Sequence, residues 1–322
     1  MDFIKQFEGK SVFHASDSDL DGVSCRLLAE YFIKPISSNY VPYNSSDRSF
    51  VEFPFEEAIE YDIVLFTDIA PPSQEFIDKL NEHSKVIIVD HHQSHRDDLG
   101  DIDNYYFSLD FCATKSFYNL LTKGKRRKLS LDMYTDLVNI YDLYITDSED
   151  WQSAKNLHNT MYGYVDWRFI NSQSDTERYE KFIDIQLMKI DQYDKFFFTA
   201  YEKRIIAKSA IKEANMYKQA KKHLQFRVDG EGNNYAYTEF SSKISLVAHK
   251  LMQEYKGEIE YIVIFSLFRK SDMKFSLRSP EDFDTKYITE KWGGGGHKSA
   301  SGMSFTDPEI FQKFREGKIH LI

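Results

Sequence analysis

The sequence predicts an α/β protein: a parallel sheet with helices on both faces, then a helical connector and a smaller α/β domain. Apolar runs alternate with helix-like stretches over the first part of the chain, and each run ends in aspartate or histidine. The pattern changes to one of shorter strands near residue 226. We therefore expect three parts, at residues 1–170, 171–225 and 226–322.

The first strand and the first helix are expected within residues 10–32. Val12 and Phe13 are typical of a strand, and a polar loop follows them. Apolar residues then recur at helical spacing from Val23 to Phe32. This order predicts a strand, a loop and a helix.

Two further apolar runs complete the expected parallel sheet. The first covers residues 61–72 and is stopped by Pro71, and the second covers residues 85–92. Between them, residues 73–84 have the pattern of a helix with Ser73 as its N-cap. Strands that alternate with helices favour parallel pairing, since each crossover covers one face of the sheet.

The rest of the chain is expected to be helical as far as about residue 225. Residues 113–150 have a helical pattern, and residues 171–225 form a charged helical connector of more than one helix. The second domain is expected to contain strands at 233–240, 259–269 and 273–279, a helix at 241–255, and a glycine-rich segment within 288–305.

Bulk composition limits the class of protein. The 322 residues are 42% hydrophobic, enough for two sizeable cores, and carry a net charge of −10. An acidic chain lacks the overall positive field of a duplex-binding protein, so a polyanionic ligand would have to be bound locally. With only Cys25 and Cys112, neither a disulfide framework nor a cysteine zinc site is expected.

The same features indicate a cytoplasmic protein. The first ten residues resemble neither a signal peptide nor a transit peptide. No apolar stretch reaches the roughly 18–20 residues that a membrane span requires. We expect no membrane contact and no duplex nucleic acid partner, and a homodimer is compatible with the sequence.

Three alternating aspartates follow the first strand. Asp17, Asp19 and Asp21 are spaced so that their carboxylates can share cations, and Gly22 permits a sharp entry into the helix. A calcium-binding EF-hand loop is excluded because its twelfth position would be Leu28 rather than glutamate. Helix N-capping would explain one of these aspartates but not all three.

The other two apolar runs also end in side chains that can bind a metal ion. Asp68 follows one of them, and Asp90, His91 and His92 follow the other. The carboxyl ends of parallel strands share one edge of a sheet, so these groups should converge with the aspartate triplet. Left unneutralised they would repel one another. Divalent cations would remove that repulsion, and the imidazoles shift the preference from Mg²⁺ towards Mn²⁺.

A glycine run provides a second unusual feature. Gly293 to Gly296 precede His297 and Lys298 inside an otherwise structured domain. Exposed backbone N–H groups and the absence of side chains allow a ligand to approach closely. A flexible linker is the alternative interpretation, and the position of the run between a helix and a strand disfavours it.

These motifs together resemble the DHH phosphoesterase superfamily, and the resemblance covers most of the chain. The first motif is Asp17-Ser-Asp19-Leu-Asp21-Gly22, the second contains Asp68, and the third is Asp90-His91-His92. Asp142 matches the fourth best, with Asp136, Asp147 and Asp150 as nearby alternatives. "GGGGHKSASG" resembles the glycine-rich box of a DHH-associated C-terminal domain, in which Arg278 occupies a substrate-binding position.

Many members of this superfamily begin the first motif with histidine. Here Asp17 stands at that position, as in RecJ-type exonucleases, and His14 lies three residues upstream. His14 is therefore either a core histidine or a substitute metal ligand.

The resemblance implies a centre of two Mn²⁺ ions, with Mg²⁺ as the alternative. Asp68 would bridge the ions, Asp90 would orient the histidines and His92 would face the scissile phosphate. One ion would be held by Asp17, Asp19 and Asp68, and the other by Asp21, Asp68, His91 and Asp142. Substrate would be bound by Arg278, Gly294, Gly295, Gly296 and His297.

Within the superfamily, the chain is most similar to the nanoRNases or oligoribonucleases, which hydrolyse short oligonucleotides to mononucleotides. The implied activity is a phosphodiesterase or exonuclease acting on short RNA or dinucleotides. The alternatives are a pAp phosphatase and a soluble phosphodiesterase for cyclic or linear dinucleotides. A catalytically degenerate nucleotide-binding protein is the alternative of another class, and the chemically competent residue in every motif argues against it.

Overall fold

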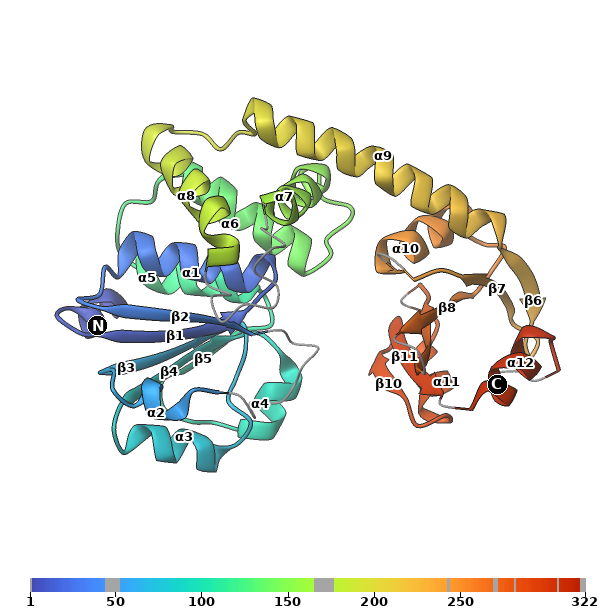
Figure 1. The fold of residues 1–322 in the computed structure, drawn as a ribbon, viewed down its shortest axis with the longest axis horizontal. Helices are drawn as coiled ribbons and strands as arrows, with labels where there is room; N and C mark the ends of the chain where they lie inside the picture. The colour runs from blue at the N-terminus through green and yellow to red at the C-terminus, as the bar shows by residue number, and fades with distance from the viewer. Residues whose placement is uncertain are drawn as a thin grey trace. The chain divides into compact units, whose positions relative to one another are not determined.

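The computed structural model describes residues 2–43, 53–164, 177–241, 244–268, 272–280, 282–305 and 307–318. The chain divides into two compact units, Met1–Ile206 and Ala207–Ile322 (Figure 1). Each unit contains its own sheet and its own hydrophobic core.

The first unit contains a five-stranded sheet in the order β2-β1-β3-β4-β5, and all of its pairings are parallel. The three expected strands are its central members. The two edge strands were not expected, because β2 is polar and contains Pro42, as edge strands tolerate, and β5 is very short. The strands are β1 (Val12–Asp17), β2 (Ser38–Tyr43), β3 (Ile63–Thr67), β4 (Lys85–Asp90) and β5 (Tyr105–Phe107).

Both faces of this sheet are buried, as the near-continuous apolar runs predict. Along β3, Ile63 and Leu65 belong to one core cluster, while Val64 and Phe66 belong to the other. Helices α1 (Leu20–Phe32) and α5 (Ala113–Thr122) contribute to the first cluster, and α3 (Gln74–Asn81) contributes to the second. The expected arrangement of a parallel sheet with helices on both faces is confirmed (Figure 1).

The helical pattern of residues 113–150 corresponds to two helices followed by a loop. Helix α5 ends at Thr122, Gly124 turns the chain with φ 74°, and the next helix ends at Asp142 and gives way to a loop. In the connector, residues 193–199 separate two helices, and residues 171–176 lie outside the described part. The remaining elements of this unit are η1 (Phe3–Phe7), α2 (Phe55–Ala58), α4 (Gln93–Leu99), α6 (Leu129–Asp142), α7 (Trp151–Tyr164) and α8 (Glu177–Gln192). Helix α9 (Ala200–Lys222) begins in the first unit and ends in the second.

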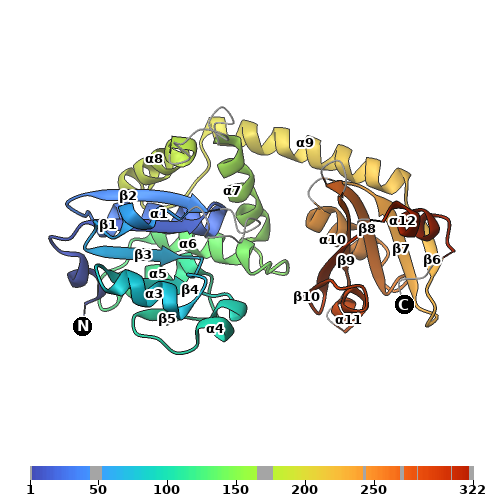
Figure 2. The ribbon, with the colours of Figure 1, turned by 60° about the horizontal axis from the view of Figure 1, so that its bottom comes forward.

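The second unit contains a six-stranded mixed sheet in the order β10-β11-β9-β8-β7-β6. Figure 2 shows β6 to β9 side by side, and the pair β7–β8 is parallel while the others are antiparallel. The three expected strands and the helix between the first two are present. The strands are β6 (Gln225–Val228), β7 (Asn234–Glu239), β8 (Tyr261–Phe268), β9 (Asp272–Arg278), β10 (Gly295–His297) and β11 (Ala300–Phe305). The helices are α10 (Ile244–Glu254), α11 (Thr285–Glu290) and α12 (Pro308–Arg315).

The hydropathy of the described helices is also informative. None of them combines the length with the apolar character that crossing a bilayer would demand.

Candidate active site

The acidic and imidazole groups of the first unit lie at one edge of its sheet. Strands β1, β3 and β4 are adjacent and parallel, and Ser16, Thr67 and Val89 occupy matching positions near their carboxyl ends. Asp17 and Asp90 are the last residues of β1 and β4, and Asp68 directly follows β3. The topology therefore brings together strand ends that are up to 73 positions apart in the sequence.

Asp68 has an unusual backbone conformation. Its φ is 60°, a left-handed value that side chains other than glycine rarely adopt, and its N–H donates to Val89 O at 2.9 Å. The side chain is only 2% exposed. Backbone strain of this kind costs of order 1–3 kcal/mol and is typically found at functional sites.

His91 lies at the centre of the carboxylates. Its Nε2 is 3.3 Å from Asp68 Oδ1, 3.3 Å from Asp142 Oδ2 and 3.8 Å from Asp21 Oδ2. Asp142 reaches this position from the last residue of α6. Asp136, on the same helix, instead forms an ion pair with Lys115 at 2.6 Å.

Three buried atoms of this cluster lack a hydrogen-bond partner in the described part of the chain. They are Asp68 Oδ1, His91 Nε2 and Asp142 Oδ2, and they come from three different elements. A buried polar atom without a partner is costly, and such atoms in a native fold call for an explanation such as a bound ion. Carboxylate oxygens with an imidazole nitrogen are a donor set that Mn²⁺ or a similar divalent cation accepts. The residues present therefore fit the expected metal.

Electrostatics supports the same interpretation. Burial, followed by the charge of Asp21, raises the pKa of Asp68 and that of Asp142 well above the usual range. Burial together with Asp17 and Asp21 raises the pKa of Asp19 to about 7. Ionised together at neutral pH, these carboxylates repel one another, and a divalent cation would reverse the sign of that energy.

The side chains of Asp19 and Asp21 also accept hydrogen bonds from backbone N–H groups at the start of two helices. Asp19 is the N-cap of α1, with Oδ1 accepting from the N–H groups of Asp21 and Gly22. Asp21 accepts from Ala113 N and Thr114 N, both at 2.8 Å, and so satisfies the first turn of α5. Each carboxylate oxygen retains a further lone pair, so these contacts do not preclude metal binding.

The importance of Gly22 has a different cause from the one expected. Its side of α1 lies so close to β1 that a Cβ atom would be 2.1 Å from Asp17 O. Close packing of helix on strand, rather than backbone flexibility, therefore requires glycine here.

Asp90 binds two histidines, His92 and His95, beside the carboxylates around His91. It is fully buried, and it accepts from His92 Nδ1 at 2.8 Å and from His95 Nδ1 at 2.6 Å. Burial alone would raise the pKa of Asp90, but these two hydrogen bonds outweigh it and hold the pKa far below its usual range. Burial lowers the pKa of His92, yet the bond and the charge of Asp90 outweigh it and leave that pKa raised.

The sequence interpretation did not select His95. The signal that could have found it is its spacing, since His95 stands three residues after His92 and residues at that spacing share a helix face. Cys112, which is fully buried, also lies near this site, beside Asp21 and Asp142.

His14 is packed in the core of the sheet. It is 4% exposed, its Nε2 is 2.8 Å from Thr67 Oγ1, and its ring meets Tyr40 edge to face. Burial and the charge of Arg26 lower its pKa to about 3, so the imidazole is neutral at pH 7. Of the two alternatives for His14, these contacts favour a core histidine.

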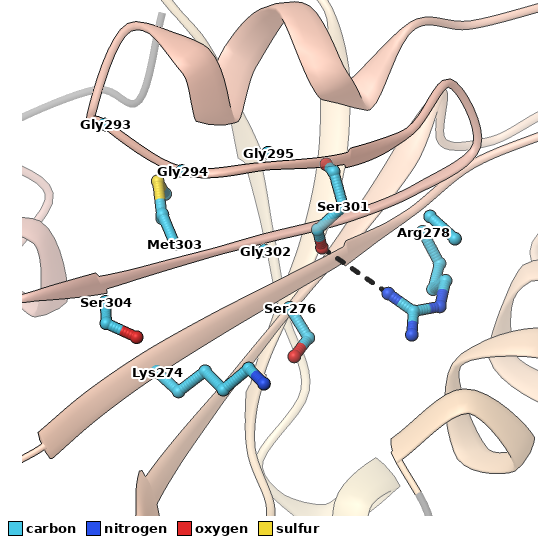
Figure 3. Close-up of a pocket in the computed structure, with 11 residues that line it drawn as sticks. Lys274, Ser276, Arg278, Gly293, Gly294, Gly295, Ser301, Gly302, Met303 and Ser304 are labelled. Atoms are coloured by element: carbon cyan, nitrogen blue, oxygen red, sulfur yellow. Dashed lines mark hydrogen bonds between the residues drawn. The ribbon is translucent and has the colours of Figure 1, made fainter. Parts of the chain in front are cut away.

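The second unit contains a pocket of about 500 Å³ beside the glycine-rich segment (Figure 3). From β9 it is lined by Lys274, Ser276 and Arg278, whose side chains share one face of the strand. Gly294 and Gly295 line it from the segment before β11. The guanidinium of Arg278 donates from Nη1 to Leu277 O at 2.8 Å and from Nη2 to Ser245 Oγ at 3.1 Å, which fixes its direction.

The glycines of this segment differ in their surroundings. A Cβ atom on Gly294 would be 2.3 Å from Gly302 O, and one on Gly296, which has φ 136°, would be 2.6 Å from Ala300 O. A Cβ atom on Gly295 would meet no atom within 4 Å. Gly296 is not among the described residues that line the pocket. The backbone of His297 belongs to β10, and its side chain lies outside the described part.

The chain is similar in sequence to known proteins. No family model matches it. It is 28% identical over 316 residues to oligoribonuclease NrnB of Bacillus subtilis, and the alignment covers 93% of this chain and 74% of that relative.

Three solved structures show the same fold. The DHH domain of a protein described as a member of a family of ribosomal proteins has a TM-score of 0.65 at 13% identity, covering 99% of this chain and 89% of that one. A pGpG-specific phosphodiesterase from Vibrio cholerae has a TM-score of 0.60 at 13% identity, covering 96% and 97%. RecJ of Thermus thermophilus in complex with Mn²⁺ has a TM-score of 0.58 at 16% identity, covering 97% and 52%. The likeness to a DHH domain expected from the motifs is confirmed.

Proposed function

We propose that this chain, which belongs to the DHH-domain phosphoesterases, is a Mn²⁺-dependent phosphodiesterase that hydrolyses short oligonucleotides to mononucleotides. The observation that carries the proposal is a set of three buried atoms, Asp68 Oδ1, His91 Nε2 and Asp142 Oδ2, which lie together and form no hydrogen bond with any described residue. The relative named as an oligoribonuclease supports the substrate class. The structural neighbours named as a phosphodiesterase and as the exonuclease RecJ agree with a nuclease-like hydrolase.

We assign Asp68, His91 and Asp142 to the centre of the cation site, and Asp17, Asp19 and Asp21 to its periphery. Two divalent cations bound there would neutralise the phosphoryl oxygens and make water a stronger nucleophile at neutral pH. His91 presents Nε2 to the carboxylates, and its pKa, lowered mainly by burial, favours the neutral imidazole, which has one nitrogen free to bind a cation.

His92 acts on the substrate in this proposal. Because Asp90 accepts from its Nδ1, the ring is fixed and Nε2 is directed away from the buried carboxylate. The raised pKa of His92 favours the protonated ring. Nε2 can then donate a hydrogen bond to a phosphoryl oxygen and a proton to the oxygen that leaves phosphorus.

The pocket of the second unit is proposed to bind the nucleotide. Arg278 supplies a fixed cation, Lys274 a second one, and the glycine segment leaves room for close approach by a ligand. This placement assigns substrate binding to residues 226–322, catalysis to residues 1–170, and the link between them to residues 171–225. It explains how a chain of net charge −10 can act on a polyanion.

A metal-dependent assay with a set of substrates tests the proposal. Purified protein with Mn²⁺ is given labelled RNA from dinucleotide to pentanucleotide, longer RNA, single-stranded DNA, pGpG, pAp and cyclic di-AMP. We expect the short RNA to be cleaved fastest, and chelation to stop the reaction. Asp68→Ala should reduce the rate by at least about a thousandfold, since the cations supply several kcal/mol of transition-state stabilisation.

The controls separate the alternatives. Asp136→Ala removes a carboxylate that lies on the same helix as Asp142 but is paired with Lys115, and it should retain activity. Full activity of Asp68→Ala would contradict the metal centre. Preference for pAp or for cyclic di-AMP would replace the oligonucleotide substrate while leaving the centre intact.

A further inference from the structure

The imidazole of His95 is hydrogen-bonded to the same carboxylate, that of Asp90, as the imidazole of His92. Asp90 accepts from His92 Nδ1 through Oδ1 and from His95 Nδ1 through Oδ2. The two rings are 4.9 Å apart between centroids, inclined at 49°. Tyr105 adds a longer hydrogen bond to Oδ2 at 3.4 Å, so both oxygens of Asp90 have donors.

This geometry directs both distal nitrogens away from the carboxylate. Asp90 is 0% exposed, whereas the side chains of His92 and His95 are 41% and 33% exposed. Because the N–H and lone-pair directions of Nδ1 and Nε2 diverge from one another, a ring whose Nδ1 donates to Asp90 directs its Nε2 away from Asp90. Neither Nε2 has a hydrogen-bond partner in the part of the chain that the structure describes.

We propose that His95 is a second phosphate-binding residue of this site, which contacts a phosphate of the substrate beside the scissile one. This inference rests on the proposed function and narrows its substrate class. The preferred substrate carries a phosphate besides the bond that is cut, as a terminally phosphorylated dinucleotide or a longer oligonucleotide does. A dinucleoside monophosphate lacks that group.

The two roles of His95 can be separated by amide substitutions. The amide nitrogen of asparagine lies near the position of Nδ1, so His95→Asn keeps the donor to Asp90 and removes the distal nitrogen. Glutamine places its amide near the position of Nε2, so His95→Gln keeps the distal donor and loses the bond to Asp90. His83→Asn, at an exposed turn outside the cluster, is the matched control.

The experiment compares hydrolysis of ApA, pApA and ApAp by these variants. Wild type should prefer a phosphorylated dinucleotide, and the arm that shows the preference identifies a 5′ or a 3′ phosphate. His95→Asn should reduce that preference by about ten- to a hundredfold, the usual effect of a hydrogen bond to a charged group, and should lower ApA hydrolysis much less than hydrolysis of the phosphorylated dinucleotide. His95→Gln should retain more of the preference than His95→Asn, and His83→Asn should retain all of it.

Two results overturn the proposal: an unchanged preference in His95→Asn, or an equal loss on all three substrates, which would mean that His95 acts only through Asp90. Calorimetric binding of phosphorothioate-linked pApA and ApA gives a second readout, which does not depend on turnover. If wild type cleaves none of the substrates, the proposed function fails. The inference then stands or falls on whether His95→Asn selectively weakens binding of the phosphorylated analogue.

Discussion

The two candidate ligand sites of this protein are built on opposite principles. The cluster at the edge of the five-stranded sheet consists of buried groups of like charge, several without hydrogen-bond partners among the described residues. The pocket of the six-stranded sheet is lined mostly by small residues and backbone, together with Lys274 and with Arg278, which is fixed by hydrogen bonds to Leu277 and Ser245. The first site needs a ligand to relieve its repulsion, whereas in the second site the guanidinium of Arg278 is hydrogen-bonded without one.

This difference suggests a division of labour. Carboxylates that are already held close together bind a compact cation tightly, because their mutual repulsion destabilises the folded protein without the ion and is relieved when the ion binds. The pocket of the second unit would bind a larger ligand through its shape and a few polar contacts. Substitution of a residue that lines it should therefore change the affinity for substrate rather than the rate of the chemical step. Substitutions in the two sites should therefore differ in kind as well as in size.

The largest expected effect is the response of stability to Mn²⁺. Wild type should gain about 3–4 kcal/mol when the ion is present at a hundred to a thousand times its Kd. Asp68→Asn should lose most of that gain. In chelator the order should reverse, with Asp68→Asn melting roughly 2–4 °C above wild type because one repelling carboxylate is gone. Thermal unfolding followed by circular dichroism, with Mn²⁺ or with EDTA, checks both halves.

If Asp68→Asn were less stable than wild type in chelator, the repulsion at this edge of the sheet would be weaker than we infer. Thr67→Ser, one residue earlier in a fully buried position, is a control for general disturbance of the strand end.

An intermediate effect is expected from the glycines. Gly294→Ala and Gly296→Ala should each destabilise the second unit by about 1–3 kcal/mol, since their Cβ atoms would clash with backbone oxygens of Gly302 and Ala300. Gly295→Ala has open space and should unfold at the wild-type denaturant concentration. Urea unfolding of the three variants measures this. Equal stability of all three would mean that β10 does not pack against β11 as described.

The smallest effect is expected for Arg278. Arg278→Ala should raise KM about tenfold, the loss of one hydrogen bond to a charged group, while manganese content and kcat change little. Lys298→Ala, on the exposed turn between β10 and β11, is the matched loss of a cation. Metal analysis together with steady-state kinetics decides the outcome, and loss of manganese in Arg278→Ala would contradict the separation of the two sites.

Much of the first site could be predicted from the sequence, for a definite reason. Continuous apolar runs ending in Asp68 and Asp90 specify buried parallel strands, and parallel strands must end at a common edge. The spacing of His95 after His92 could have marked His95 as a candidate, but its pairing with Asp90 could not be predicted, because it depends on a distance of 2.6 Å across the start of α4. Nor could the attachment of Asp21 to α5, which joins residues 92 positions apart.

The glycine-rich segment was located by the sequence but explained incompletely. A run of glycines indicates close approach without saying what approaches. For Gly294 and Gly296 the neighbour is the backbone of β11. Steric need of this kind depends on sheet register, to which the sequence gives little access.

The double duty of Asp19 and Asp21 has a consequence for how this protein can change over evolutionary time. Their carboxylates start two helices, so mutation there harms the fold even when catalysis is no longer under selection. Asp68 and Asp142 carry no such obligation. In a lineage that loses the hydrolytic activity, Asp19 and Asp21 should therefore be retained after Asp68 and Asp142 have been replaced. The presence of Asp68 and Asp142 is then the better indicator that a homologous protein is still an active enzyme.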